Sequence, residues 1–186
     1  MFIVFEGTDG TGKTTAARHL AKRLRCAEPS TVYNEMRAIR DYIDRLDTPL
    51  ARMHYWLAVN HAESDRVRSL AGSSTADHVV LDSYFYRTIV THGALGLDAE
   101  RYLDWSTVAK PDYVFLLTTD LETRMARLLA RDASLYRNKW EQRIFESSDQ
   151  IDTHYRKFDV IEIDTTTVGP EEVIDLVVAK VGGSCE

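Results

Sequence analysis

The sequence is poor in cysteine and in long apolar runs, and both absences limit what the protein can be. Two cysteines in 186 residues give no disulfide framework and no metal-ligand spacing. The longest apolar runs, Met1–Phe5, Val79–Leu81 and Tyr113–Leu117, are far shorter than a membrane span. The first run leads directly into Glu6, without the basic flank or the small-residue cleavage site of a signal peptide. We therefore expect a cytoplasmic protein without a membrane segment.

Positive charge is also in deficit. The chain has 23 Lys and Arg against 29 Asp and Glu, for a formal net charge of −6. This balance argues against nucleic acid as a partner, because duplex-binding proteins usually present a broad basic surface. There is no internal repeat and no low-complexity linker, and 44% hydrophobic and 28% charged residues are typical of a globular protein. The composition predicts a single domain over residues 1–186.

Apolar runs of strand length alternate with longer amphipathic stretches. Strands are expected at Phe2–Phe5, Thr31–Tyr33, His78–Asp82, Tyr113–Leu117 and Val160–Ile163. Helices are expected at Thr14–Arg25, Arg37–Leu46, Leu50–Leu70, Tyr86–His92, Asp98–Val108, Leu121–Ala130, Glu141–Lys157 and Pro170–Val181. Strands that are apolar on both faces and alternate with helices indicate a parallel sheet covered on both sides. The predicted fold class is α/β, a three-layer sandwich with a five-stranded parallel sheet.

A glycine-rich loop after the first strand is the most specific signal. Residues 7–14 read Gly-Thr-Asp-Gly-Thr-Gly-Lys-Thr and match G-x-x-x-x-G-K-[ST] in full, between a strand and a helix. The glycines let backbone N–H groups wrap a phosphate, and the helix directs its positive end at the anion. Lys13 would bridge the β- and γ-phosphates, and the Thr14 hydroxyl would bind Mg²⁺. The predicted nucleotide contacts are Gly7, Thr8, Gly10, Thr11, Gly12, Lys13, Thr14 and Thr15.

Carboxylates end two of the expected strands. Asp82 follows a buried strand, and ligands of open α/β sheets gather at the carboxyl ends of the strands. A carboxylate there can hold Mg²⁺ through water, or it can cap the following helix. Glu6 ends the first strand at the same edge, and we keep it as a supporting candidate.

Residues 2–15, Phe-Ile-Val-Phe-Glu-Gly-Thr-Asp-Gly-Thr-Gly-Lys-Thr-Thr, resemble the opening of thymidylate kinases, in which F-E-G-x-D-G-x-G-K-T-T is distinctive. Weaker similarity covers nearly the whole chain. Residues 58–63 resemble the family's F-A-x-D-R-A-E helix, and Asp82-Ser83-Tyr84, with Gly93 nine residues after the tyrosine, resembles its D-R-Y motif. The resemblance implies a P-loop nucleoside monophosphate kinase fold with a mobile lid, use of ATP and Mg²⁺, and a homodimer.

The resemblance also bears on catalysis. Asp9 would contact the acceptor or the metal, with a turn-forming aspartate as the alternative. Some family members carry a catalytic arginine at the position of Gly10, so this chain is similar to the branch that supplies arginine from the lid. The predicted lid is the basic segment, residues 131–143, with the cations Arg131, Arg137, Lys139 and Arg143. A closing arginine can stabilise a transferring phosphoryl group, whereas the alternative is a solvated basic helix face. The catalytic candidates are Lys13, Asp9, Arg137 and Arg143.

The acceptor side departs from the family pattern. Three arginines that clamp the monophosphate in thymidylate kinases correspond here to Asn34, His61 and Ser83. Neutral side chains cannot supply the bidentate, charge-assisted contact that arginine makes with phosphate. The available replacements are Arg37, Arg40 and Arg87, of which Arg87 lies one helical turn after Ser83 and on the same side. A surface salt bridge is the alternative for Arg87.

Three further residues are candidates for the acceptor pocket. Trp56 and Tyr84 could stack on an aromatic acceptor, although aromatic residues at helical spacing usually belong to the core. His61 lies in the pocket if the register of the family holds, and a structural histidine is the alternative.

The sequence therefore predicts a Mg²⁺- and ATP-dependent phosphotransferase similar to thymidylate kinase, with a pyrimidine nucleotide as acceptor and dTMP as the first to test. A kinase of a free nucleoside or another metabolite is one alternative, favoured by the altered clamp. A nucleotide-binding regulatory protein without turnover is the other. The basic segment argues against it, because lid arginines are useful chiefly for transfer. The absence of an N-K-x-D motif favours ATP over GTP.

Overall fold

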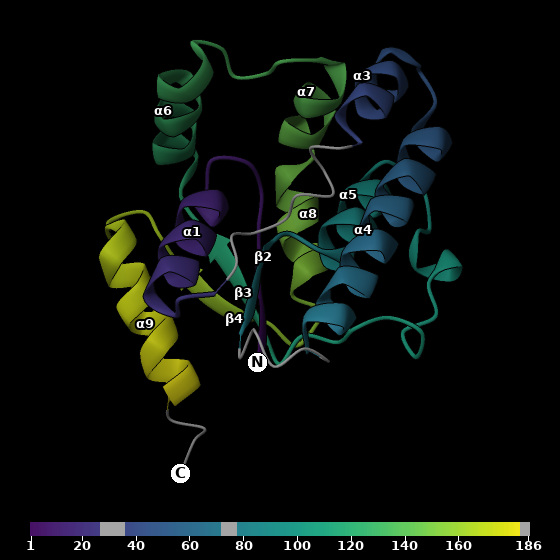
Figure 1. Cartoon of the computed structure of the whole chain (residues 1–186). Coiled ribbons are helices and arrows are strands. Elements are labelled where there is room, and N and C mark those ends of the chain that lie inside the picture. The colour runs from purple at the N-terminus through teal and green to yellow at the C-terminus, as the bar shows by residue number, and fades with distance from the viewer. Residues whose placement is uncertain (27–35, 72–77, 183–186) are drawn as a thin grey trace.

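The computed structural model describes residues 1–26, 36–71 and 78–182 of the chain (Figure 1). Its strands are β1 (Phe2–Glu6), β2 (Val79–Asp82), β3 (Tyr113–Thr118) and β4 (Ile161–Asp164). They form one parallel sheet in the order β2-β1-β3-β4. The prediction of five strands is corrected to four for the described part of the chain. The expected strand at Thr31–Tyr33 lies outside the described residues.

Helices cover both faces of this sheet. They are α1 (Lys13–Arg23), α3 (Arg37–Arg45), α4 (Pro49–Ala71), α5 (Phe85–Ala94), α6 (Leu121–Asp132), α7 (Lys139–Glu146), α8 (Ser148–Tyr155) and α9 (Pro170–Gly182), together with the short 3₁₀ helix η1 (Glu100–Tyr102). Figure 1 shows α1 and α9 on one side of the sheet and α4, α5 and α8 on the other. Within the described ranges, every helix is too short or too polar to cross a lipid bilayer.

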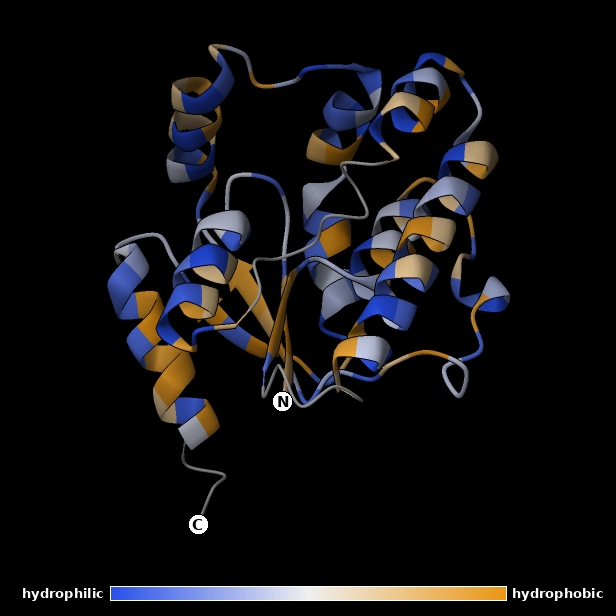
Figure 2. Ribbon diagram, viewed as in Figure 1, coloured by the Kyte–Doolittle hydropathy of each residue, from blue (hydrophilic) through white to orange (hydrophobic). Residues whose placement is uncertain are grey.

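The alternation of side chains along β1 divides the core into two layers. Ile3 and Phe5 pack with residues of α1 and α9, whereas Phe2 and Val4 pack with residues of α4 and α5. Successive side chains of a strand point to opposite faces, so a central strand must be apolar throughout. Figure 2 shows the strands and much of α9 in the orange of hydrophobic residues. The first strand is therefore apolar until Glu6, which brings a charge to the edge of the sheet.

Two expected helices differ in the structure. The stretch Asp98–Val108 contains only η1, because the Asp104 carboxylate accepts hydrogen bonds from the Ser106 N–H at 2.9 Å and hydroxyl at 2.7 Å and so forms a turn. The stretch Glu141–Lys157 forms two helices, α7 and α8, interrupted at Ser147. Both stretches contain serines, which compete with regular backbone hydrogen bonding.

The basic segment connects α6 to α7. Helix α6 ends at Asp132, and Ala133 follows with a positive φ of 53°. Helix α7 begins again at Lys139, where the Asn138 side chain accepts hydrogen bonds from the backbone N–H groups of Trp140 and Glu141, both at 3.0 Å. Arg137 therefore lies in the connection, whereas Lys139 and Arg143 belong to the helix.

Candidate functional site

The glycine-rich loop leads from β1 into α1 at the carboxyl edge of the sheet. Gly7, Gly10 and Gly12 have φ values of 133°, 91° and 97°, which side chains rarely adopt. A Cβ atom at Gly7 would also clash with the carbonyl oxygen of Leu117 in β3. Only glycine can therefore occupy position 7 on this path. The loop then continues into α1, which begins at Lys13.

Lys13 is folded back onto the loop. Its side chain is buried, and its Nζ donates a hydrogen bond to the Thr8 carbonyl oxygen at 2.8 Å and lies 3.9 Å from Oδ1 of Asp9. Burial and the positive charge of Arg87 both lower the pKa of Lys13. The ammonium group is thus held within the loop, where an anion would stabilise it.

The Thr14 hydroxyl and the Asp82 carboxylate meet at the ends of two adjacent strands. Thr14 Oγ1 donates a hydrogen bond to Oδ2 of Asp82, which ends β2 beside β1. Among the described residues, no group of three or more His, Cys, Asp or Glu could hold a metal ion. Magnesium usually takes only one or two protein ligands together with waters and substrate phosphates. A hydroxyl and a carboxylate in contact therefore fit Mg²⁺ that arrives with a nucleotide.

Arg87 joins the loop from α5. Its Nη1 donates to the Gly7 carbonyl oxygen at 2.5 Å, and its Nη2 donates to Oδ1 of Asp9 at 3.0 Å. Although burial opposes it, the charges of Arg87 and Lys13 hold the pKa of Asp9 well below its usual range. The structure thus brings together Arg87, Asp9 and Lys13, which the sequence analysis named separately, and concentrates charge of both signs beside the loop.

The other acceptor candidates lie in different surroundings. Tyr84 is 1% exposed, packs edge-on against Phe85 and donates its hydroxyl to the Ala109 carbonyl oxygen at 3.1 Å, so it serves the core in this structure. His61 is exposed on α4, with its ring edge-on to Phe85 at 5.1 Å between centroids. Trp56 is half-buried and faces two arginines of α3 and α4. Asn34 lies outside the described residues.

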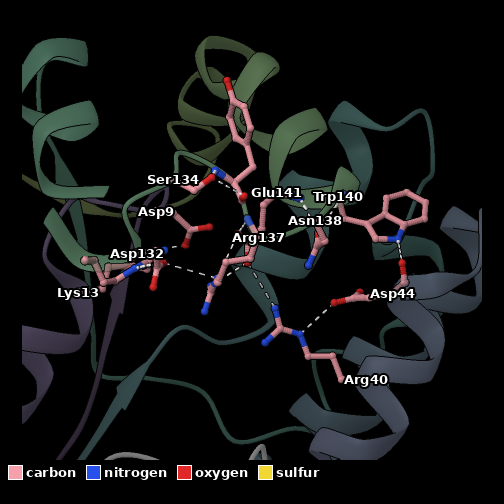
Figure 3. A network of polar contacts seen from close by, with 12 residues as sticks. Asp9, Lys13, Arg40, Asp44, Asp132, Ser134, Arg137, Asn138, Trp140 and Glu141 are labelled. Atoms are coloured by element: carbon pink, nitrogen blue, oxygen red, sulfur yellow. Dashed lines mark hydrogen bonds and ion pairs between the residues drawn. The ribbon is translucent and has the colours of Figure 1, made fainter. Parts of the chain in front are cut away.

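The two arginine candidates of the basic segment are separated. Arg137 pairs with Glu141, Nη2 to Oε1 at 2.7 Å, and Glu141 lines the same hollow as Thr8 and Asp9 of the loop. Figure 3 shows Arg137 between the loop residues and α3. Arg143 instead pairs with Asp47, Nη1 to Oδ1 at 3.1 Å, beyond α3. The geometry therefore associates Arg137, and not Arg143, with the loop.

Two arginines of α6 near the loop were missed in the sequence analysis. Arg127 donates to the Thr165 carbonyl oxygen at 2.7 Å and to the Gly10 carbonyl oxygen at 3.4 Å, while Thr165 Oγ1 donates to the Thr11 carbonyl oxygen at 3.0 Å. Arg124 is 5% exposed, and its guanidinium lies 4.2 Å from the centre of the Phe145 ring. On a helix of mixed charge these arginines look like solvated residues, so no sequence signal distinguished them.

Glu6 is the least expected member of the site, because it is a fully buried carboxylate at the end of an apolar strand. Its Oε1 accepts a hydrogen bond from the Tyr84 N–H at 2.8 Å, and its Oε2 accepts one from the Tyr155 hydroxyl at 3.0 Å. Burial raises the pKa of Glu6 to about 7, against these two hydrogen bonds and the charges of Arg87 and Lys13. Glu6 therefore links the phosphate-loop strand to the turn after β2 and to α8.

This raised pKa predicts how stability depends on pH. The folded chain holds a proton on Glu6 up to about pH 7, whereas the unfolded chain releases it near the ordinary glutamate pKa of 4.5. The folded state therefore binds more protons between these values, and stability falls as the pH rises through this window. The contribution is on the order of 3 kcal/mol.

Denaturant unfolding of the wild type and Glu6→Gln from pH 4.5 to 8 measures this effect. The wild type should lose stability relative to Glu6→Gln as the pH rises. Parallel stability curves for the two proteins would show that Glu6 does not titrate in this range.

A glycine-rich loop followed by lysine and threonine, at the carboxyl edge of a parallel sheet and beside an aspartate, defines a nucleotide-binding α/β protein. Residues 5–175 match the family model described as thymidylate kinase. The chain belongs to the thymidylate kinase family and is a nucleotide kinase.

Individual relatives agree with this placement over most of the chain. The chain is 32% identical over 186 residues to a probable thymidylate kinase of Methanocaldococcus jannaschii, covering 93% of this chain and 91% of the relative. A probable thymidylate kinase of Methanococcus vannielii is 29% identical over 184 residues, with 94% and 91% covered.

Among solved structures, thymidylate kinase from Candida albicans has a TM-score of 0.72 at 18% identity, covering 98% of this chain and 91% of that one. Deoxyadenosine kinase from M. mycoides has a TM-score of 0.65 at 17% identity, covering 98% and 100%. These structures share the fold.

Proposed function

We propose that the protein transfers the γ-phosphoryl group of ATP to dTMP with the help of Mg²⁺. Family membership and the relatives named as probable thymidylate kinases support this substrate pair. The observation that carries the proposal is the contact of Arg87 with both the Gly7 carbonyl oxygen and Asp9, beside Lys13. This contact places the guanidinium group of Arg87 next to the phosphate loop, in a chain that lacks arginine at the three usual clamp positions.

On this proposal, each residue of the loop has a distinct role. The loop amides and Lys13 hold the β- and γ-phosphates of ATP. Thr14 and Asp82 hold Mg²⁺, which neutralises charge on the phosphate oxygens when it is bound. Transfer requires no covalent nucleophile, because an oxygen of the acceptor phosphate attacks the γ-phosphorus directly while the bond from that phosphorus to the bridging oxygen breaks and ADP leaves. The protein contributes position and charge.

Arg87 takes the place of the missing clamp. A guanidinium presents five N–H donors in a rigid fork, and the contacts to Gly7 and Asp9 use one N–H on each terminal nitrogen. The remaining donors can contact an acceptor phosphate, and Asp9 fixes the plane of the fork. Ser83, the neutral residue in the family's arginine position, lies four residues earlier in the chain, before α5 begins.

The same proposal covers the organisation of the chain. We treat residues 1–186 as one kinase domain, in which the basic segment closes over the bound nucleotide and its arginines exclude water. The homodimer stays a prediction from the family resemblance.

Release of ADP from ATP and Mg²⁺ tests the proposal, with dTMP, dUMP, thymidine or no acceptor present in parallel. We expect turnover that depends on dTMP and exceeds the rate with thymidine or without acceptor. Stimulation by thymidine alone would contradict the proposal and make the altered clamp a change of substrate class. Tight ATP binding without turnover on any of these acceptors would contradict it as well.

A further inference from the structure

A buried carboxylate occupies the junction between the basic segment and α3. Glu141 lies in the first turn of α7 and is 8% exposed. A hollow beside the phosphate loop is lined by Thr8 and Asp9 of the loop and by Glu141 of α7. A carboxylate buried to this extent needs strong partners, because an uncompensated buried charge is costly.

Arg137 is the main partner of this carboxylate, and it is held through both its backbone and its side chain. Glu141 Oε2 accepts hydrogen bonds from the Arg137 backbone N–H at 2.9 Å and from Nε at 3.2 Å, while Oε1 lies 2.7 Å from Nη2. The chain has no helical structure at Arg137, since α6 ends at Asp132 and α7 begins at Lys139. Glu141 thus fixes a residue that helical hydrogen bonds do not fix.

A series of ion pairs connects this contact to the body of the protein. Glu141 Oε1 also lies 3.8 Å from Nη2 of Arg40 in α3, and Arg40 in turn pairs with Asp44, Nε to Oδ2 at 3.1 Å. Trp140 Nε1 donates to the carbonyl oxygen of Asp44 at 3.1 Å and makes a second tie between α7 and α3. Figure 3 shows the contacts from Arg137 through Glu141 to Arg40 and Asp44 of α3, with Asp9 and Lys13 of the loop drawn beside them. From α4 to α6, the charges alternate in the order Arg52, Asp44, Arg40, Glu141, Arg137, Asp132 and Arg131.

The second acidic contact of the basic segment provides a contrast. Asp47 is 65% exposed and pairs with both Lys139 at 3.2 Å and Arg143 at 3.1 Å. Ion pairs in such exposed surroundings contribute little, because water and salt screen them. The two contacts therefore differ in burial and in which arginine they hold.

We propose that Glu141 is a positioning residue that fixes Arg137 at the junction between the loop and α3, and that, of the two arginine candidates of the basic segment, Arg137 and not Arg143 acts in phosphoryl transfer. The inference rests on the proposed function, since it assigns a role within that reaction. Glu141 acts through Arg137, so removing its charge has an effect only while Arg137 is present.

A double-mutant cycle with Arg137→Gln and Glu141→Gln tests the proposal, with Asp47→Asn as the matched control. The cycle is measured twice, as kcat with dTMP and as ATP affinity by calorimetry. We expect Arg137→Gln to lower kcat about 100-fold and Glu141→Gln to lower it about 10-fold. The double variant should have the same low kcat as Arg137→Gln alone. The same non-additivity is expected in ATP affinity. Asp47→Asn should change kcat by less than about twofold and should be additive with Arg137→Gln.

Additive losses in the Arg137 and Glu141 cycle would overturn the inference, and so would a higher kcat in Glu141→Gln. An Asp47→Asn variant as impaired as Glu141→Gln would also contradict it, because the exposed contact would then matter as much as the buried one. Failure of the proposed function has a different signature, namely no dTMP-dependent turnover in the wild type. The cycle in ATP affinity would still report whether Glu141 acts through Arg137.

Discussion

Replacing Lys13 with alanine should lower turnover with ATP and dTMP by at least about 100-fold, the effect of removing a group that stabilises developing charge directly. The ammonium group lies inside the loop, bonded to Thr8 and near Asp9, so no other described side chain occupies its position. The measurement is the steady-state rate of ADP release, with ATP affinity followed separately. Because Lys13 would contact phosphates that gain charge during transfer, kcat should fall more than ATP affinity.

Lys22 provides the matched control on the same helix. It is exposed in the last turn of α1, so Lys22→Ala removes an equal charge far from the loop and should keep turnover within about twofold of the wild type. Both variants should unfold at the same temperature as the wild type to within a few degrees. A well-folded Lys13→Ala protein with wild-type turnover would show that the loop lysine takes no part in phosphoryl transfer.

Replacing Arg87 with glutamine should have the second largest effect, and the loss should concentrate on the acceptor. We expect kcat/KM for dTMP to fall on the order of 100-fold, as losing a charged contact of about 3 kcal/mol would give. Arg87→Lys should recover only part of this loss, because an ammonium group cannot bridge Gly7 and Asp9 as a fork does. Initial rates over a range of dTMP concentrations, at saturating ATP, measure the effect.

Arg101 is an exposed arginine of η1 and serves as the control for a lost positive charge. Arg101→Gln should leave kcat/KM for dTMP within about twofold of the wild type. If Arg87→Gln has no larger effect than Arg101→Gln, the acceptor clamp must come from another arginine, with Arg37 and Arg40 as the remaining sequence candidates.

The parts of the fold that depend on local pattern could be predicted from the sequence. Apolar runs identified the strands of the described sheet, and the match to G-x-x-x-x-G-K-[ST] placed Lys13 at the start of a helix. Arg87 was named for a helical spacing from Ser83 that the structure does not have, because α5 begins only at Phe85 and Ser83 has a positive φ of 73°, yet Arg87 does contact the loop. Each of these conclusions needs only residues that are close together along the chain.

The remaining parts depend on contacts between distant residues. Tyr84 is only two residues after Asp82, yet Tyr84 belongs to the core whereas Asp82 lies at the site. The chain turns between them at Ser83, whose positive φ of 73° no sequence rule anticipated. Arg137 and Arg143 are both arginines of the basic segment, and the sequence does not distinguish their roles. In the structure they differ in their acidic partners, Glu141 for Arg137 and Asp47 for Arg143. Which acid meets which arginine is decided by packing, and a single sequence does not record it.

The tie from Arg127 and Thr165 to the loop has a consequence for the order in which the protein forms. Thr165 and Thr11 are separated by 154 positions, and Arg127 and Gly10 by 117. The loop is synthesised before Arg127 and Thr165, so these hydrogen bonds form only after the chain has been extended past both residues. Contacts of such long range are slow to form. A nascent chain that ends before Thr165 therefore carries the complete loop sequence without the hydrogen bonds that hold its shape, and nucleotide affinity should arise late in synthesis.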